Sequence, residues 1–230
     1  MTRTTRTHQK EHNAHDYEKV ERELPDLKYF YLQCKVCHQV VYPIPQMQKL
    51  WEYSQNHQFM FLQDWALAIL YSQSMPMIGI TSFMKQLFLT LIEFAPHYNI
   101  PTENPGFRGY KFGPYSERIE DVIIGLEEAG LIKTAGRRGA AGEYFTLTEE
   151  GGKLALKSFS KLTREQQDAL REARLDWHQL GSSGLMKYIY RNYRDFAKES
   201  VILERVLHKR RIGRKTWVKV NDQESESEND

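Results

Sequence analysis

Several features that would place a chain in a specialised class are missing from this sequence. Only two cysteines occur among 230 residues, separated by two positions, which excludes a disulfide framework. No run of about 18 apolar residues exists, so no transmembrane helix is expected. The first residues are polar and basic and have no apolar core segment, so no secretory signal is expected. These absences predict a cytoplasmic protein.

Short motifs of the common enzyme classes are also missing. The chain has no P-loop, no dinucleotide fingerprint, no His-Glu-x-x-His and no Gly-x-Ser-x-Gly. We therefore expect a protein that is not an enzyme. The composition, 40% hydrophobic and 27% charged, is that of an ordinary soluble protein that can bury a core unaided.

Charge is distributed unevenly at the C-terminal end. The formal net charge is +2, but the last ten residues carry five acids and no base, so the remainder stands at 32 − 25 = +7. The preceding segment 205–215 (RVLHKRRIGRK) holds six Lys or Arg and no acid. A basic block before an acidic tail is compatible with nucleic-acid binding moderated by self-competition. A solvated helix end followed by a disordered tail fits equally well.

The residue pattern divides the chain into five segments. We expect a polar arm over 1–25 with a helix at 16–24, a Cys-x-x-Cys hairpin plus helix over 26–58, a central domain over 59–160, a C-terminal helical extension over 161–215 and an acidic disordered tail over 216–230. The hairpin follows from an alternating aromatic and β-branched run that two prolines close. The predicted fold class is mainly α with small β.

The central domain contains the clearest local signals. Ser116 is the expected N-cap of an amphipathic helix that Gly130 ends. The runs LIKTA and EYFTLT are predicted to be paired strands joined by GRRGAAG, before a helix capped by Thr148. Thr81 or Ser82 is the expected cap of an earlier helix, and GSSG at 181–184 predicts a break between two C-terminal helices.

Three stretches carry a family resemblance. They are ILYSQSMPMIGITSFMKQLFLTLIEF, FRGYKFGPYSERIEDVIIGLEEAGLI and EYFTLTEEGGKLAL, and the resemblance spans residues 60–200 or so. Together they resemble a group of uncharacterised winged-helix proteins of bacteria, archaea and phages, and phage-associated antitoxin-like proteins share parts of this outline. The wing and the LTEEG segment are similar to the PadR and MarR repressors. The resemblance implies a winged helix-turn-helix core.

A winged helix binds DNA through the free N–H groups at a helix start and through a basic wing tip. The residues expected to contact DNA lie at the wing tip, at the helix entry and in the basic C-terminal segment: Arg137, Arg138, Arg108, Lys111, Tyr115, Ser116, Arg118, Lys209, Arg210, Arg211, Arg214 and Lys215.

The charge of the helix 116–129 opposes groove reading. It carries five acids against one base, a net of −4, and exposed carboxylates lower the affinity for phosphates. The acids are Glu117, Glu120, Asp121, Glu127 and Glu128, and the base is Arg118. An acidic face of this kind suits contact with a basic protein, or it is simply a solvated surface.

The motif CKVCH supplies two thiolates from a hairpin, which is half of a tetrahedral zinc site. We expect Cys34 and Cys37 to be ligands, with His57 as the best third ligand. Candidates for the fourth ligand are His38, Glu52, His8, His12 and His15. FYLQCKVCHQVVYPIP also resembles the zinc knuckle of ferric-uptake-type repressors, and two chains sharing one zinc, or two free thiols without metal, are further possibilities.

Two other interpretations of the motif are set aside. Haem attachment at Cys-x-x-Cys-His requires an exported chain. A thioredoxin-like pair requires the first cysteine at a helix start, and HQVVYPIP does not begin a helix.

The sequence leads to three functional hypotheses. The first is a dimeric winged-helix transcriptional regulator that binds double-stranded DNA through wing arginines and the basic C-terminal segment. The second is a protein-interaction adaptor, antitoxin-like or part of a complex, whose acidic helix meets a basic partner. The third is an enzyme or nuclease accessory with a metal site in the N-terminal appendage.

Overall fold

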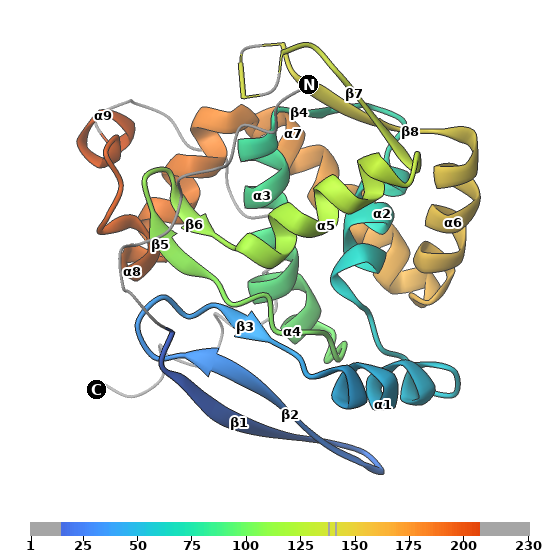
Figure 1. Ribbon diagram of the computed structural model, residues 1–230. Coiled ribbons are helices and arrows are strands. Elements are labelled where there is room, and N and C mark those ends of the chain that lie inside the picture. The colour runs from blue at the N-terminus through green and yellow to red at the C-terminus, as the bar shows by residue number, and fades with distance from the viewer. Residues whose placement is uncertain (1–14, 138, 141, 208–230) are drawn as a thin grey trace, which may run out of the picture.

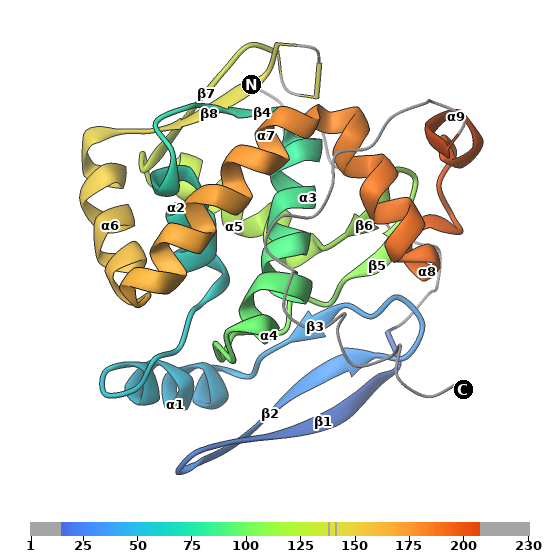
Figure 2. The ribbon, with the colours of Figure 1, turned by 180° about the vertical axis from the view of Figure 1, so that it is seen from behind.

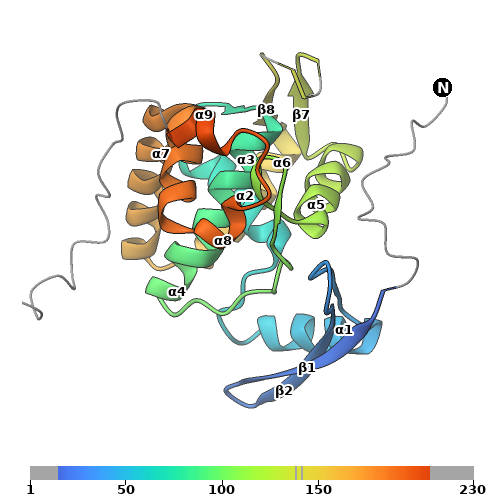
Figure 3. The same cartoon turned by 90° about the vertical axis from the view of Figure 1, so that its left-hand side faces the viewer.

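The computed structural model describes residues 15–137, 139–140 and 142–207. These residues form a small N-terminal unit below a larger, mostly helical unit (Figures 1 and 3). The predicted class, mainly α with small β, is confirmed. Within the described residues, no helix is both long and apolar enough to cross a membrane.

The N-terminal unit is a three-stranded antiparallel sheet, in the order β1–β2–β3, with one helix packed against it. Its elements are β1 (Tyr17–Leu24), β2 (Leu27–Cys34), β3 (Val40–Val41) and α1 (Ile44–Ser54). Aromatic side chains dominate its core, among them Tyr29, Tyr31, Tyr42, Phe59 and Phe61.

The prediction of a helix over 16–24 is wrong, because these residues form β1. All eight residues of β1 pair with β2, from Tyr17 opposite Cys34 to Leu24 opposite Leu27. Helix propensity of Glu, Lys and Arg is a weak preference of tenths of a kcal/mol per residue. Pairing with an aromatic strand, including Lys19 over the Phe30 ring, outweighs it.

The larger unit begins with two packed helices and a second small sheet. Its elements up to the last strand are α2 (Leu62–Ser72), β4 (Met77–Ile78), α3 (Ile80–Leu89), the π-helix η1 (Thr90–Phe94), α4 (Ala95–His97), β5 (Arg108–Tyr110), β6 (Gly113–Tyr115), α5 (Glu117–Glu128), β7 (Ile132–Ala135) and β8 (Tyr144–Leu147). β5 and β6 form a hairpin, and β4, β8 and β7 form an antiparallel sheet in that order. α2 is buried on nearly every side and is therefore the central helix of this unit.

The caps of α5 and α6 follow the predictions. Ser116 Oγ accepts the N–H of Ile119 at the start of α5, and Gly130 follows α5 with a φ of 70°. Thr148 Oγ1 accepts the N–H of Gly151 at the start of α6 (Glu149–Ser160).

The start of α3 differs from the prediction of a Thr81 or Ser82 cap. The helix begins at Ile80, after Gly79 with a φ of 74°, and its N-cap residue makes no side-chain capping hydrogen bond. A residue distant in the sequence caps the helix instead, since the Glu143 carboxylate accepts a hydrogen bond from the Ile80 N–H at 2.9 Å.

The first helix of the C-terminal extension packs across the back of α2 and α3, and the rest of the extension lies beside β5 and β6 (Figure 2). It consists of α7 (Arg164–Asn192), α8 (Arg194–Ala197) and α9 (Leu203–Leu207). The predicted break at GSSG is a kink at Gly181, where φ is 61°, and the helix continues beyond it. The expected tail over 216–230 lies outside the described residues.

Candidate metal cluster and the entry of helix α5

The turn between β2 and β3 holds a cluster of three potential metal ligands. Cys34 ends β2, Cys37 lies in the turn, and both are buried. His15 lies beside them, with its Nδ1 3.5 Å from Cys37 Sγ. One ligand atom from each of the three lies within 4.8 Å of the others. This cluster could hold a metal ion.

The thiols differ in their acidity. Burial raises the pKa of Cys34, but hydrogen bonds from the Cys37 backbone and from His15 have the opposite and larger combined effect. The net result is a pKa of about 6. Burial raises the pKa of Cys37 above its usual value. A low-pKa thiol paired with a second thiol and an imidazole is the donor chemistry that zinc prefers.

The histidine in this cluster is not the one predicted as the third ligand. His57 stacks on Tyr53 with ring centroids 4.1 Å apart, and it is not in the cluster. His38 is next to the motif, but its backbone is left-handed with a φ of 59° and it is also outside the cluster. His15 joins because β1 pairs along its whole length with β2 and so carries the preceding residue to the cysteines. His15 is one of the candidates for the fourth ligand, and the pairing of 17–24 as a strand singles it out.

The remaining ligand candidates are Glu52, His8 and His12. Glu52 is on α1, accepts a hydrogen bond from Gln48 and is not in the cluster. His8 and His12 lie outside the described residues.

The cluster lies close to the start of α5. Burial raises the pKa values of Tyr17 and Cys37, and the nearby Glu117 carboxylate adds a smaller increase to both. A loop before α5 packs on the same turn, where a Cβ added at Gly106 would come within 2.6 Å of the His38 carbonyl oxygen. The N-terminal turn and the entry of α5 therefore form one continuous region.

Side chains expected to contact DNA at this entry are engaged inside the protein. Ser116 is fully buried, and its hydroxyl donates to the Pro105 carbonyl at 2.5 Å besides capping α5. The prediction that Ser116 contacts DNA is therefore corrected. The Tyr115 hydroxyl donates to Glu120, and burial, followed by that carboxylate, raises the pKa of Tyr115.

The two arginines of the entry also turn inward. Arg108 is buried and donates to Glu117 at 2.6 Å. Arg118 donates to the buried carboxylate of Glu103 and lies over the Tyr42 ring, 4.9 Å from its centroid. Both guanidinium groups thus fix α5 to its neighbours.

A buried lysine holds the strand before α5. Lys85 on α3 donates to the Pro114 carbonyl at 2.6 Å. Burial lowers the pKa of Lys85 to about 7. This contact ties α3 to β6 and sets the direction in which the chain enters α5.

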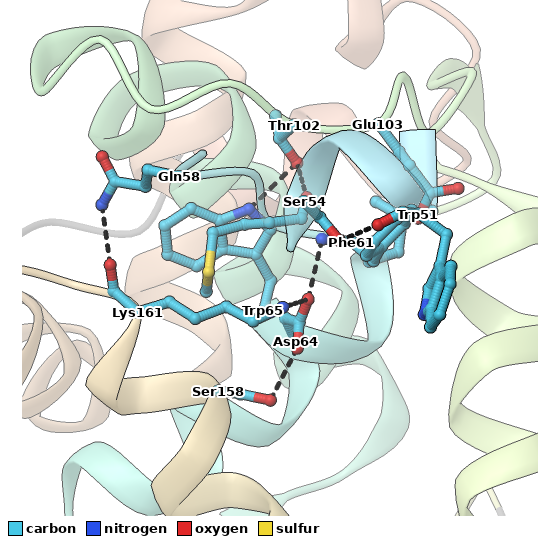
Figure 4. A network of polar contacts seen from close by, with 12 residues as sticks. Trp51, Ser54, Gln58, Phe61, Asp64, Trp65, Thr102, Glu103, Ser158 and Lys161 are labelled. Carbon is cyan, nitrogen blue, oxygen red and sulfur yellow. Dashed lines mark hydrogen bonds and ion pairs between the residues drawn. The ribbon is translucent and has the colours of Figure 1, made fainter. Parts of the chain in front are cut away.

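Two carboxylates at the start of α2 complete the framework (Figure 4). Asp64 accepts from the Phe61 N–H at 3.0 Å, from Ser158 at 2.7 Å and from Lys161 at 2.7 Å. Glu103 accepts the Leu62 N–H at 2.8 Å. Burial raises the pKa of Glu103, and the Arg118 charge opposes this increase. The network joins α2, α5 and α6.

The other predicted DNA contacts fall into two groups. Arg137 at the tip between β7 and β8, and Lys111 in the β5–β6 turn, are exposed. The rest lie outside the described residues: Arg138, Lys209, Arg210, Arg211, Arg214 and Lys215.

Comparisons of this chain with protein-family models, with curated proteins and with solved structures gave no match.

Proposed function

We propose that residues 59–160 form a winged helix used as a protein-interaction module, in which α5 meets a basic partner. Support for the fold is the order α2, β4, α3, α5, β7 and β8, with β4–β8–β7 as one antiparallel sheet. The loop between β7 and β8 takes the place of the wing, and α5 takes the place of the helix that enters a DNA groove.

The observation that carries the proposal is the inward direction of the arginines. Arg118 is the only base of α5 and it pairs with buried Glu103. Asp121 and Glu128 are exposed on the same helix. A negatively charged surface repels phosphates and attracts Lys and Arg side chains. The adaptor hypothesis is therefore favoured over groove reading by α5.

Charge reversal on α5 tests this function. We expect Asp121→Lys combined with Glu128→Lys to abolish co-purification of partners that wild-type protein retains from its own cells. The matched control is Glu172→Lys, which reverses an exposed acid in the middle of α7. The retained partner is expected to be basic and to elute with salt, because rim charges act through screened attraction. Equal loss in the control would contradict the proposal.

DNA binding through the wing is the second candidate, because Lys133 on β7 and Arg137 at the tip are both exposed. A titration of fluorescent duplex DNA at low salt decides between the two. The adaptor hypothesis predicts no binding. Binding with a steep salt dependence that weakens in Arg137→Ala would favour the wing instead.

We propose further that the cluster of His15, Cys34 and Cys37 holds a structural zinc ion. A tetrahedral site requires four ligands, and the described residues supply three. The ion would join the β2–β3 turn to the residue before β1 and so stabilise the surface on which the loop before α5 packs.

Metal analysis separates the candidate histidines. We expect one zinc per freshly purified chain, and its loss in Cys37→Ser and His15→Ala. His57→Ala and His38→Ala are the matched controls and should keep the metal. Chelation should lower the melting temperature of wild type but not of Cys37→Ser, because metal binding contributes folding free energy. Wild-type protein without metal, or zinc lost in His57→Ala but kept in His15→Ala, would contradict the assignment of His15 as a zinc ligand.

A further inference from the structure

A pocket lies between the start of α3, residues 139–140 and 142–143 before β8, and the C-terminal helices. Its volume is about 350 Å³, within the usual range of ligand sites, about 300 to 1,000 Å³. Its walls include Ile80, Ser82, Phe112, Glu143, Ser182 and Arg205. None of these residues belongs to the metal cluster.

The chemistry of the pocket centres on Glu143, which is 1% exposed. One carboxylate oxygen, Oε2, accepts the Ile80 N–H at 2.9 Å. The other, Oε1, is buried and has no hydrogen-bond partner among the described residues. A buried carboxylate oxygen without a donor is unfavourable. Glu143 therefore offers a buried acceptor at a defined atom in a residue that lines the pocket.

The surroundings of Glu143 suit a cation on an apolar stem. Ser82 and Ser182 share one hydrogen bond of 2.6 Å between their hydroxyls, and each oxygen keeps lone pairs that can accept an N–H. Phe112 is 47% exposed on the same wall, and an aromatic face attracts guanidinium groups. Ile202 and Met186 give an apolar path along which a methylene chain can pack.

We infer that this pocket receives an arginine side chain of the basic protein partner, with its guanidinium group donating to Glu143 Oε1. The inference rests on the proposed function for the identity of the partner. In a pocket lined by a carboxylate and two hydroxyl acceptors, the planar guanidinium fork fits better than a lysine ammonium does.

The position of the pocket agrees with a partner that also touches α5. Ile80, Thr81 and Phe112 line both this pocket and an adjoining groove of about 530 Å³. The far side of that groove includes Glu120 of α5. Arg205 stands in the same pocket wall and is exposed. Its positive charge would oppose an incoming cation and weaken binding.

The test uses N-acetylarginine N-methylamide, with the citrulline analogue as its uncharged match. In a ¹H–¹⁵N NMR titration of the full chain, we expect the arginine compound to shift the amides of Ile80, Gly142 and Ser182, and the citrulline compound to leave them unchanged. Glu143→Gln should weaken binding at least tenfold, because it keeps an oxygen for the Ile80 N–H but puts an amide N–H₂ at the open position. Arg205→Gln should tighten it about threefold, since a like charge leaves the pocket.

Three outcomes would overturn the inference: no shift with the arginine compound, equal shifts with both compounds, or unchanged binding in Glu143→Gln with a native spectrum. The double variant Asp121→Lys and Glu128→Lys should bind the small compound as wild type does. Failure of this titration therefore leaves the α5 test standing, and failure of the α5 test leaves this one standing.

Discussion

Replacing Arg118 with methionine should destabilise the protein by about 3 to 5 kcal/mol, the usual cost of leaving a buried charge unpaired. Glu103 is 4% exposed, and Arg118 provides its opposite charge. The second bond of Glu103, from the Leu62 N–H, does not replace a full positive charge. Urea unfolding at pH 7 measures the loss.

The pH dependence of the Arg118→Met variant identifies the cause. The pKa of Glu103 is already raised by burial, and loss of Arg118 raises it further. At pH values between the ordinary pKa of 4.5 and the raised pKa of Glu103 in the folded state, the folded protein binds more protons than the unfolded protein. Stability therefore falls as the pH rises through this range. The destabilisation should therefore shrink when the pH is lowered from 7 towards 5.

Two variants control this prediction. Lys153→Met removes an exposed pair with Glu149 and Glu150, and its effect should stay within about 0.5 kcal/mol. Glu103→Gln combined with Arg118→Met removes both charges and should recover much of the stability. An Arg118→Met loss that is equally large at pH 5 and pH 7 would show that packing, and not the uncompensated carboxylate, is responsible.

Adjacent glycines at the start of α6 should respond in opposite directions to alanine. A Cβ at Gly151 would overlap the carbonyl oxygen of Leu131, whereas a Cβ at Gly152 meets nothing within 4 Å. The Leu131 carbonyl cannot move freely, because it also accepts the Thr148 N–H at 3.0 Å. We expect Gly151→Ala to cost roughly 3 kcal/mol or more by overpacking.

Gly152→Ala should instead stabilise by about 0.5 to 1 kcal/mol, because alanine is the better helix residue. Thermal and urea unfolding of the two single variants measure the difference. Similar effects at both positions would mean that helix propensity alone governs this turn and that the contact with Leu131 does not constrain α6.

Local signals predicted the elements whose causes are local. The Ser116 and Thr148 caps, the glycine after α5 and the β7–β8 pair depend on residues within one turn or one hairpin. Side-chain caps and left-handed glycines act at fixed short spacing, so a single sequence shows them. The thiol pair of the metal cluster is local in the same way, since Cys34 and Cys37 share one turn.

Distant partners decided the rest. Residues 17–24 became a strand because β2 offered an aromatic face to pair with. That pairing brought His15, and not His57, to the cysteines. The start of α3 is closed by Glu143, which lies 63 positions further along the chain.

The sequence by itself determined the class, mainly α with small β, the caps of α5 and α6 and the acidic composition of α5. Only the tertiary structure decided which of these charges face outward. Arg118 and Ser116 look like exposed contacts in the sequence, yet one pairs with Glu103 and the other is buried against Pro105. The reason is that a buried carboxylate or hydroxyl must find a partner, and that partner is set by packing between segments that lie far apart in the chain.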